Sequence, residues 1–173
     1  TSNDDLIYPT KCWQHKKDAT KKFVKLKNGI LNMATGTGKT STALIILSNL
    51  FQQKKVRSII ITIVGENKAL LSQWNEEIKK WKNENNELYP EIANLKVIRE
   101  YGSDSDFSHF INFPENKILL LSGNRRSKYK TIINSLYNNE HSEKSLIIHD
   151  EVHNFPTASM RLDCSGLGER INY

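Results

Sequence analysis

The sequence predicts an α/β fold in which a mostly parallel sheet carries helices on both of its faces. Short β-branched runs, apolar almost throughout, alternate along the chain with longer segments of helical periodicity. Such runs are typical of strands that are covered on both faces. A glycine-rich sequence also stands between the first run and the next helical segment. That junction is where α/β sheets bind their ligands, so the pattern predicts a binding site there.

The length and composition are those of a single globular domain. The 173 residues are enough to bury a hydrophobic core. Lys and Arg number 25 against 19 Asp and Glu, and the formal charge of +6 favours polyanionic partners. Cys12 and Cys164 lie far apart and form no CxxC pair, which argues against a disulfide scaffold and suits a reducing cytoplasm. No apolar run reaches the length of a membrane span, so no membrane partner is expected.

The elements follow from the periodicity of apolar residues. An N-terminal helix is predicted over about 10–27, because Pro9 and the candidate cap Thr10 precede a helical pattern. Strands are predicted over 29–33, 58–64, 95–98, 117–121 and 145–149. Helices are predicted over 40–51, 67–82 and 126–137. Core packing is the preferred role for Trp74, which shares one stripe with Leu70, Ile78 and Trp81.

The run from Met33 to Thr40 predicts a phosphate-binding loop. Gly36 and Gly38 allow the backbone to turn tightly and to point its N–H groups at phosphate oxygens. Lys39 brings a cation to the β- and γ-phosphates, and the Thr40 hydroxyl is a ligand for Mg²⁺. The strict G-x-x-x-x-G-K-[ST] pattern is not met, because Met33 occupies its first position. The predicted site binds ATP with Mg²⁺ through Thr35, Gly36, Thr37, Gly38, Lys39, Thr40 and Ser41.

Two adjacent acidic residues at the end of the last predicted strand complete this site. Asp150 is expected to hold Mg²⁺, and Glu151 to orient or deprotonate the attacking water. A rival interpretation takes His149 and His153 as zinc ligands of an H-E-x-x-H type. That pattern requires a helix and a Glu directly after the first His, whereas a strand and Asp150 stand here. No role is assigned to His149.

Together, the runs Ala34 to Thr40 and Asp150 to His153 resemble superfamily 2 helicases, in the DEAD/DEAH-box, type III restriction subunit-like branch. The resemblance covers nearly the whole chain and implies a P-loop NTPase domain of RecA-like fold. It implies ATP hydrolysis coupled to movement on nucleic acid, with catalytic roles for Lys39, Asp150, Glu151 and His153. Trp13-Gln14 followed by Ala19 is similar to the family's upstream glutamine motif, although its spacing is longer. Gln14 is therefore expected to read the adenine edge, and its alternative is an exposed helix residue.

The same resemblance implies nucleic-acid contacts in three segments. Leu70 to Trp74 is similar to the family's motif Ia. In that family the loop before this motif, here Val64 to Lys68, contacts the nucleic-acid backbone. Tyr101-Gly102-Ser103 resembles the next loop, and a basic run follows the strand predicted at 117–121. The expected contact residues are Gly65, Lys68, Gly102, Arg125, Arg126 and Lys128. DNA is preferred over RNA on the resemblance alone.

We expect residues 1–173 to form one helicase ATP-binding domain with a core over 28–173, which stops before the family's Ser-Ala-Thr motif and second RecA-like domain. Because that second domain supplies arginine fingers, which contribute about 10³–10⁵ in rate, the chain alone is expected to hydrolyse ATP slowly or not at all. Other expected partners are subunits of restriction or defence complexes. Two alternatives remain open: a P-loop kinase acting on a small molecule, and a non-catalytic nucleic-acid-binding remnant.

Overall fold

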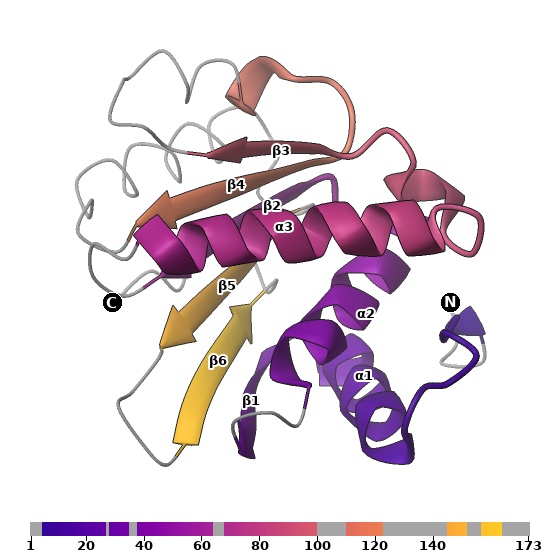
Figure 1. Cartoon of the computed structure of the whole chain (residues 1–173). Coiled ribbons are helices and arrows are strands. Elements are labelled where there is room, and N and C mark those ends of the chain that lie inside the picture. Colours follow the sequence, from indigo (N-terminus) through magenta and orange to yellow (C-terminus); the bar gives the residue numbers. More distant parts are fainter. Residues whose placement is uncertain are drawn as a thin grey trace.

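The computed structural model describes residues 5–26, 28–34, 38–63, 68–99, 110–122, 145–151 and 157–163 (Figure 1). The strands are β1 (Asn28–Ala34), β2 (Ser58–Ile63), β3 (Lys96–Arg99), β4 (Lys117–Ser122), β5 (Ser145–Glu151) and β6 (Thr157–Asp163). The helices are α1 (Gln14–Leu26), α2 (Lys39–Gln52) and α3 (Lys68–Asn85), with a short 3₁₀ helix η2 (Pro90–Ile92). The strands form one six-stranded sheet in the order β1-β6-β5-β2-β4-β3.

The pairing of the strands confirms the predicted α/β class with a mostly parallel sheet. β3, β4, β2 and β5 pair in parallel. β1 runs in the same direction, because both β1 and β5 are antiparallel to β6, which lies between them. The strand β6 was not predicted, because polar and apolar residues alternate along it and it contains no continuous apolar run. Its pairing places Ser159 opposite Glu151.

Alternation along β2 divides the hydrophobic core between the two faces of the sheet. Ile59 and Ile61 are fully buried in the cluster that α1, α2 and α3 cover, and Figure 1 shows α3 lying across the strands. Ile60 is fully buried on the opposite face, where it packs with Phe110 from the helical turn 110–112. The helix predicted over 126–137 lies outside the described residues.

The helices bury the residues that their periodicity predicts. α2 is the central helix, and every residue from Thr42 to Phe51 is buried. In α3, Trp74 and Ile78 are buried, and Leu70 and Trp81 pack partly buried against the same cluster. α1 begins later than predicted, since the Cys12 N–H donates to the Pro9 carbonyl and closes a separate turn before the helix. Across the described part of the chain, no helix combines the length and apolarity needed to cross a bilayer.

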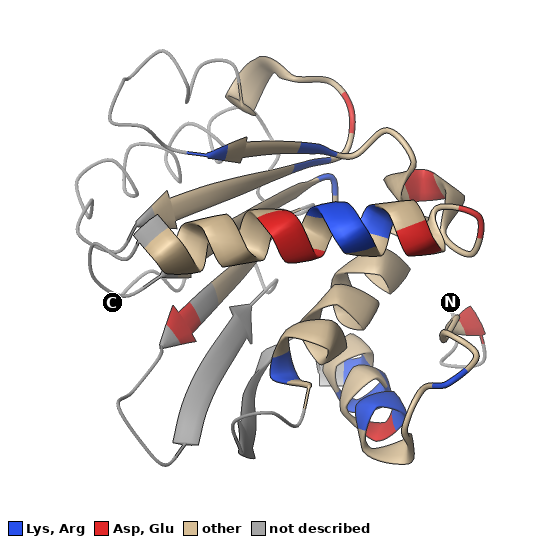
Figure 2. Cartoon of the chain, viewed as in Figure 1, with Lys and Arg blue, Asp and Glu red and all other residues tan. Residues whose placement is uncertain are grey.

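The positive charge of the chain is concentrated around α1. The segment from Lys11 to Lys27 holds seven lysines against Asp18 alone, a difference of +6 that equals the formal charge of the whole chain. Figure 2 shows this concentration on α1, whereas α3 carries charges of both signs. Lys21, Lys22 and Lys25 are exposed. This helix therefore presents a basic surface, to which polyanions are attracted.

Candidate functional site

The start of α2 is shaped by Gly38. This residue caps the helix with φ 85°, in the left-handed region that favours glycine. A Cβ here would lie 2.7 Å from Nζ of Lys16. The Gly38 carbonyl accepts hydrogen bonds from the Thr42 N–H at 2.9 Å and from the Ser41 hydroxyl at 3.0 Å. The first N–H groups of α2 have no intrahelical partner, and the positive end of the helix dipole favours an anion at this position.

An ion pair joins the start of α2 to the end of β5. Nζ of Lys39 lies 3.1 Å from Oδ1 of Asp150, although 111 residues separate them in the sequence. Their side chains are only 13% and 4% exposed, so the pair is largely shielded from water. An ammonium group has three donors, which leaves Lys39 with the capacity to hold phosphate oxygens as well. The structure thus brings together a cation and a carboxylate that the sequence predicted for one site.

The second oxygen of Asp150 is held by α3. The indole Nε1 of Trp74 donates a hydrogen bond of 2.9 Å to Oδ2, and both residues are buried. The core packing expected for Trp74 is therefore present, together with a polar contact that sequence reasoning missed. A tryptophan on an apolar helical stripe gives no indication that its N–H reaches a carboxylate on a strand.

Lys16 of α1 is a second lysine at the start of α2. Its Nζ donates to the Ser41 hydroxyl at 2.7 Å and lies 5.4 Å from the centre of the Trp13 ring. Within the described segments, Lys16 has no ion pair with a carboxylate. The sequence did not single it out, because it is one lysine among seven in this segment. Lys16 and Lys39 therefore both place positive charge beside the N-terminus of α2, where an anion would be stabilised.

Gln14 is exposed at the start of α1. Its Nε2 donates to Oδ1 of Asp18 at 2.9 Å, one turn further along the same helix. Gln14 is thus an exposed helix residue, which is the alternative that the sequence left open. A contact of Gln14 with adenine stays a prediction.

Other predicted residues are described in part or not at all. Thr40 is half-buried in the first turn of α2, next to Lys39. Glu151 ends β5 directly after Asp150, and Lys68 begins α3, but only their backbones are described. The predicted residues outside the described segments are Thr35, Gly36, Thr37, Gly65, Gly102, Arg125, Arg126, Lys128 and His153.

The donors gathered here fit a magnesium nucleotide. The Asp150 carboxylate and the Thr40 hydroxyl offer oxygen atoms, which are the ligands that Mg²⁺ prefers. Magnesium at nucleotide sites is usually held by one or two protein oxygens together with water and substrate phosphates. The described residues contain no group of three or more His, Cys, Asp or Glu that could hold a metal ion. Lys39 and the N-terminus of α2 supply the complementary preference for phosphate.

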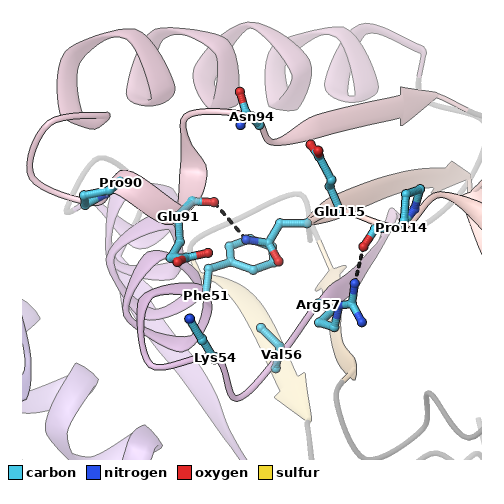
Figure 3. A pocket seen from close by; sticks show the side chains of 10 residues that line it. Phe51, Lys54, Val56, Arg57, Pro90, Glu91, Asn94, Pro114 and Glu115 are labelled. Carbon is cyan, nitrogen blue, oxygen red and sulfur yellow. Dashed lines mark hydrogen bonds between the residues drawn. The ribbon is translucent and has the colours of Figure 1, made fainter.

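A pocket of about 530 Å³ lies at the opposite, amino-terminal edge of the sheet (Figure 3). Arg57 and Asn116, which directly precede β2 and β4, are among its lining residues. Asn116 donates to the Glu91 carbonyl at 2.8 Å, and Arg57 donates to the Pro114 carbonyl. None of the residues predicted to bind nucleotide lines this pocket. It is therefore separate from the site formed by Lys39 and Asp150.

Comparison with known proteins agrees with this geometry. The family model described as type III restriction enzyme, res subunit, matches residues 10–164, a span that includes Lys39, Trp74 and Asp150. No curated protein and no solved structure gives a significant match. Membership of this family implies a helicase-like ATPase that uses nucleotide with Mg²⁺ and interacts with nucleic acid in general. Because the match covers most of the chain, the protein belongs to the type III restriction enzyme res subunit family and carries a helicase superfamily 2 N-terminal ATPase domain.

Proposed function

We propose that this chain is the ATP-binding domain of an ATP-dependent DNA helicase or translocase, which couples ATP hydrolysis to movement along nucleic acid. One observation carries the proposal: Lys39 from α2 and Asp150 from β5 meet at 3.1 Å beside the N-terminus of α2. A cation, a carboxylate and free helix N–H groups at the carboxyl edge of a parallel sheet are the parts that a magnesium–triphosphate site needs. Membership of the family supports the same function.

In this proposal the side chains divide the work on the triphosphate. Lys39 turns from Asp150 towards the β- and γ-phosphates, while the N–H groups at the start of α2 hold phosphate oxygens. Asp150 and the Thr40 hydroxyl would hold Mg²⁺, which would neutralise negative charge on the phosphates. Glu151, the next residue of β5, orients or deprotonates the attacking water. His153 links the state of the nucleotide to nucleic-acid binding, as the family resemblance implies.

The nucleic-acid partner is proposed to be DNA, with RNA as the alternative. The basic segment from Lys11 to Lys27 supports a polyanionic partner, since it carries the whole net charge of the chain. Lys68 at the start of α3 and the predicted loop residues Gly65, Gly102, Arg125, Arg126 and Lys128 remain proposed contacts. A second RecA-like domain and subunits of a restriction or defence complex remain proposed partners, and the cytoplasm the proposed location.

Hydrolysis of ATP by the full-length protein, with and without DNA, tests this function. We expect DNA to stimulate turnover, and Glu151→Gln to lower it by about 10²–10⁴-fold, the range of general-base catalysis, while ATP stays bound. Lys39→Ala should instead lose nucleotide binding. Unchanged turnover in Glu151→Gln would contradict the assigned base. Phosphate transfer to a small molecule without any effect of nucleic acid would favour the kinase alternative.

A further inference from the structure

Trp74 joins α3 to the Lys39–Asp150 pair through a buried hydrogen bond. Its Nε1 lies 2.9 Å from Oδ2 of Asp150, and the tryptophan is 1% exposed. The indole N–H donates and cannot accept, so it satisfies an oxygen of the ionised carboxylate. Hydrogen bonds of this kind, with one charged partner, are shorter and stronger than neutral ones, and the buried setting strengthens them further.

The two donors on Asp150 come from two different helices. Lys39 of α2 takes Oδ1, and Trp74 of α3 takes Oδ2. Together they fix the rotation of the carboxylate about its own axis. If Lys39 turns to a phosphate when nucleotide binds, Trp74 is the donor that still holds the carboxylate. The contact therefore matters most in the nucleotide-bound protein.

Trp81 offers an internal comparison on the same helix. It lies seven residues after Trp74 on the same apolar stripe, and its Nε1 donates to the Ser48 hydroxyl of α2 at 2.8 Å. Trp81 therefore anchors α3 to α2 through a neutral hydroxyl. The bond from Trp74 is similar in length, at 2.9 Å, but ends on the carboxylate of the site. Anchoring of the helix alone does not require a carboxylate as partner.

We propose that Trp74 is a positioning residue, which holds the Asp150 carboxylate in the orientation that a magnesium nucleotide requires. A displacement of α3 would then change the orientation of this carboxylate, so that the helix and the site are coupled. The inference rests on the proposed nucleotide function. It predicts that loss of the indole N–H changes the response to Mg²⁺ rather than the binding of nucleotide as such.

The first test compares Trp74→Phe with Trp81→Phe in the full-length protein. Each variant removes one indole N–H and keeps an aromatic ring. ATP binding is measured at equilibrium over a range of Mg²⁺ concentrations. Loss of a residue that supports a metal ligand usually weakens metal binding by about 10–100-fold, so Trp74→Phe should need at least about tenfold more Mg²⁺ for half-maximal binding. Trp81→Phe should keep the Mg²⁺ dependence of the wild type.

The second test has its main readout in the wild-type protein, so this readout does not depend on the folding of a variant. The indole ¹H–¹⁵N resonance of each tryptophan is followed by NMR during addition of ATP and Mg²⁺. The Trp74 resonance should shift on addition of Mg²⁺–ATP, while the Trp81 resonance should stay in place. Asp150→Asn should also shift the Trp74 resonance in the absence of nucleotide.

The outcomes distinguish failure of the positioning role of Trp74 from failure of the proposed nucleotide function. Equal Mg²⁺ dependence in Trp74→Phe and Trp81→Phe, or a Trp74 resonance unmoved by Mg²⁺–ATP, would overturn the positioning role while ATP binding stands. Absence of ATP binding by the wild-type protein would overturn the nucleotide function, and the positioning role with it. In that case Asp150→Asn would still report on the hydrogen bond itself.

Discussion

Two lysines with little exposure lie at opposite ends of the strands, one at the carboxyl ends and one at the amino ends. They show how the same residue type serves function and fold. Lys39 lies beside the carboxyl end of β5 and pairs with Asp150 at 3.1 Å. Lys117 begins β4 at the amino edge and donates to the carbonyls of Ile111 and Phe113 at 3.0 and 2.9 Å. Backbone carbonyls are fixed partners. A carboxylate is a partner that an incoming phosphate can replace, which suits Lys39 to a binding site.

The charges around the two lysines also differ: a positive group lies near Lys117, whereas a carboxylate pairs with Lys39. Burial and, to a smaller extent, the nearby positive charge of Arg57 together lower the pKa of Lys117 from its ordinary value to about 8. The charge of Lys117 is thus unfavourable in the folded protein, and its amine serves to hold the carbonyls of Ile111 and Phe113 at the end of the turn 110–112. Lys39 has a carboxylate as its counter-ion. The difference indicates a binding role for Lys39 and a structural role for Lys117.

The largest expected effect is a loss of ATP affinity when Lys39, but not Lys117, is replaced. Lys39→Met should weaken ATP binding by about 100-fold or more, since it removes the cation that makes charged hydrogen bonds to the β- and γ-phosphates. Lys117→Met, the matched control at the other edge, should bind ATP as the wild type does. Isothermal titration calorimetry of both variants measures the effect. Similar losses of affinity in the two variants would break the distinction between the edges.

An effect of intermediate size concerns Lys117 and pH. Its pKa is about 8 in the folded protein and 10.5 for the ordinary group, so between these pH values the unfolded chain binds more protons. The free energy of unfolding should therefore rise with pH across this window, on the order of 1–2 kcal/mol from this group. Urea unfolding at pH 8 and pH 10 measures the change. In Lys117→Met the rise should be smaller, and an equal rise would show that other groups cause it.

The smallest expected effect is the contribution of Lys16 to ATP affinity at the carboxyl ends of the strands. Lys16→Met removes the second positive charge at the start of α2 and should weaken ATP binding about two- to fivefold, the range for a charge at a helix end. Lys17→Met is the control, because Lys17 is the next residue of α1 and lies over the Tyr8 ring, 5.5 Å from its centre. Nucleotide titrations at low salt compare the two variants. Equal affinities of the two variants would exclude Lys16 from the binding site.

The sequence predicts the parallel strands and the site residues better than it predicts the contacts between them. Continuous apolar runs mark strands covered on both faces, and β2, β4 and β5 were found in this way. The alternating segment Thr157–Asp163 was missed, although alternation is itself typical of a half-buried strand. The contacts of Lys16 with Ser41 and of Trp74 with Asp150 join distant parts of the chain. Such contacts depend on how the helices pack, and no local pattern encodes them.

The central claim is that the carboxyl edge of the sheet binds a magnesium nucleotide through Lys39 and Asp150. The most direct measurement is calorimetric titration of ATP, with and without Mg²⁺, into the wild-type protein and into Asp150→Asn. The account predicts that Mg²⁺ strengthens ATP binding by the wild type and that Asp150→Asn loses most of this gain. An equal gain from Mg²⁺ in both proteins would contradict it.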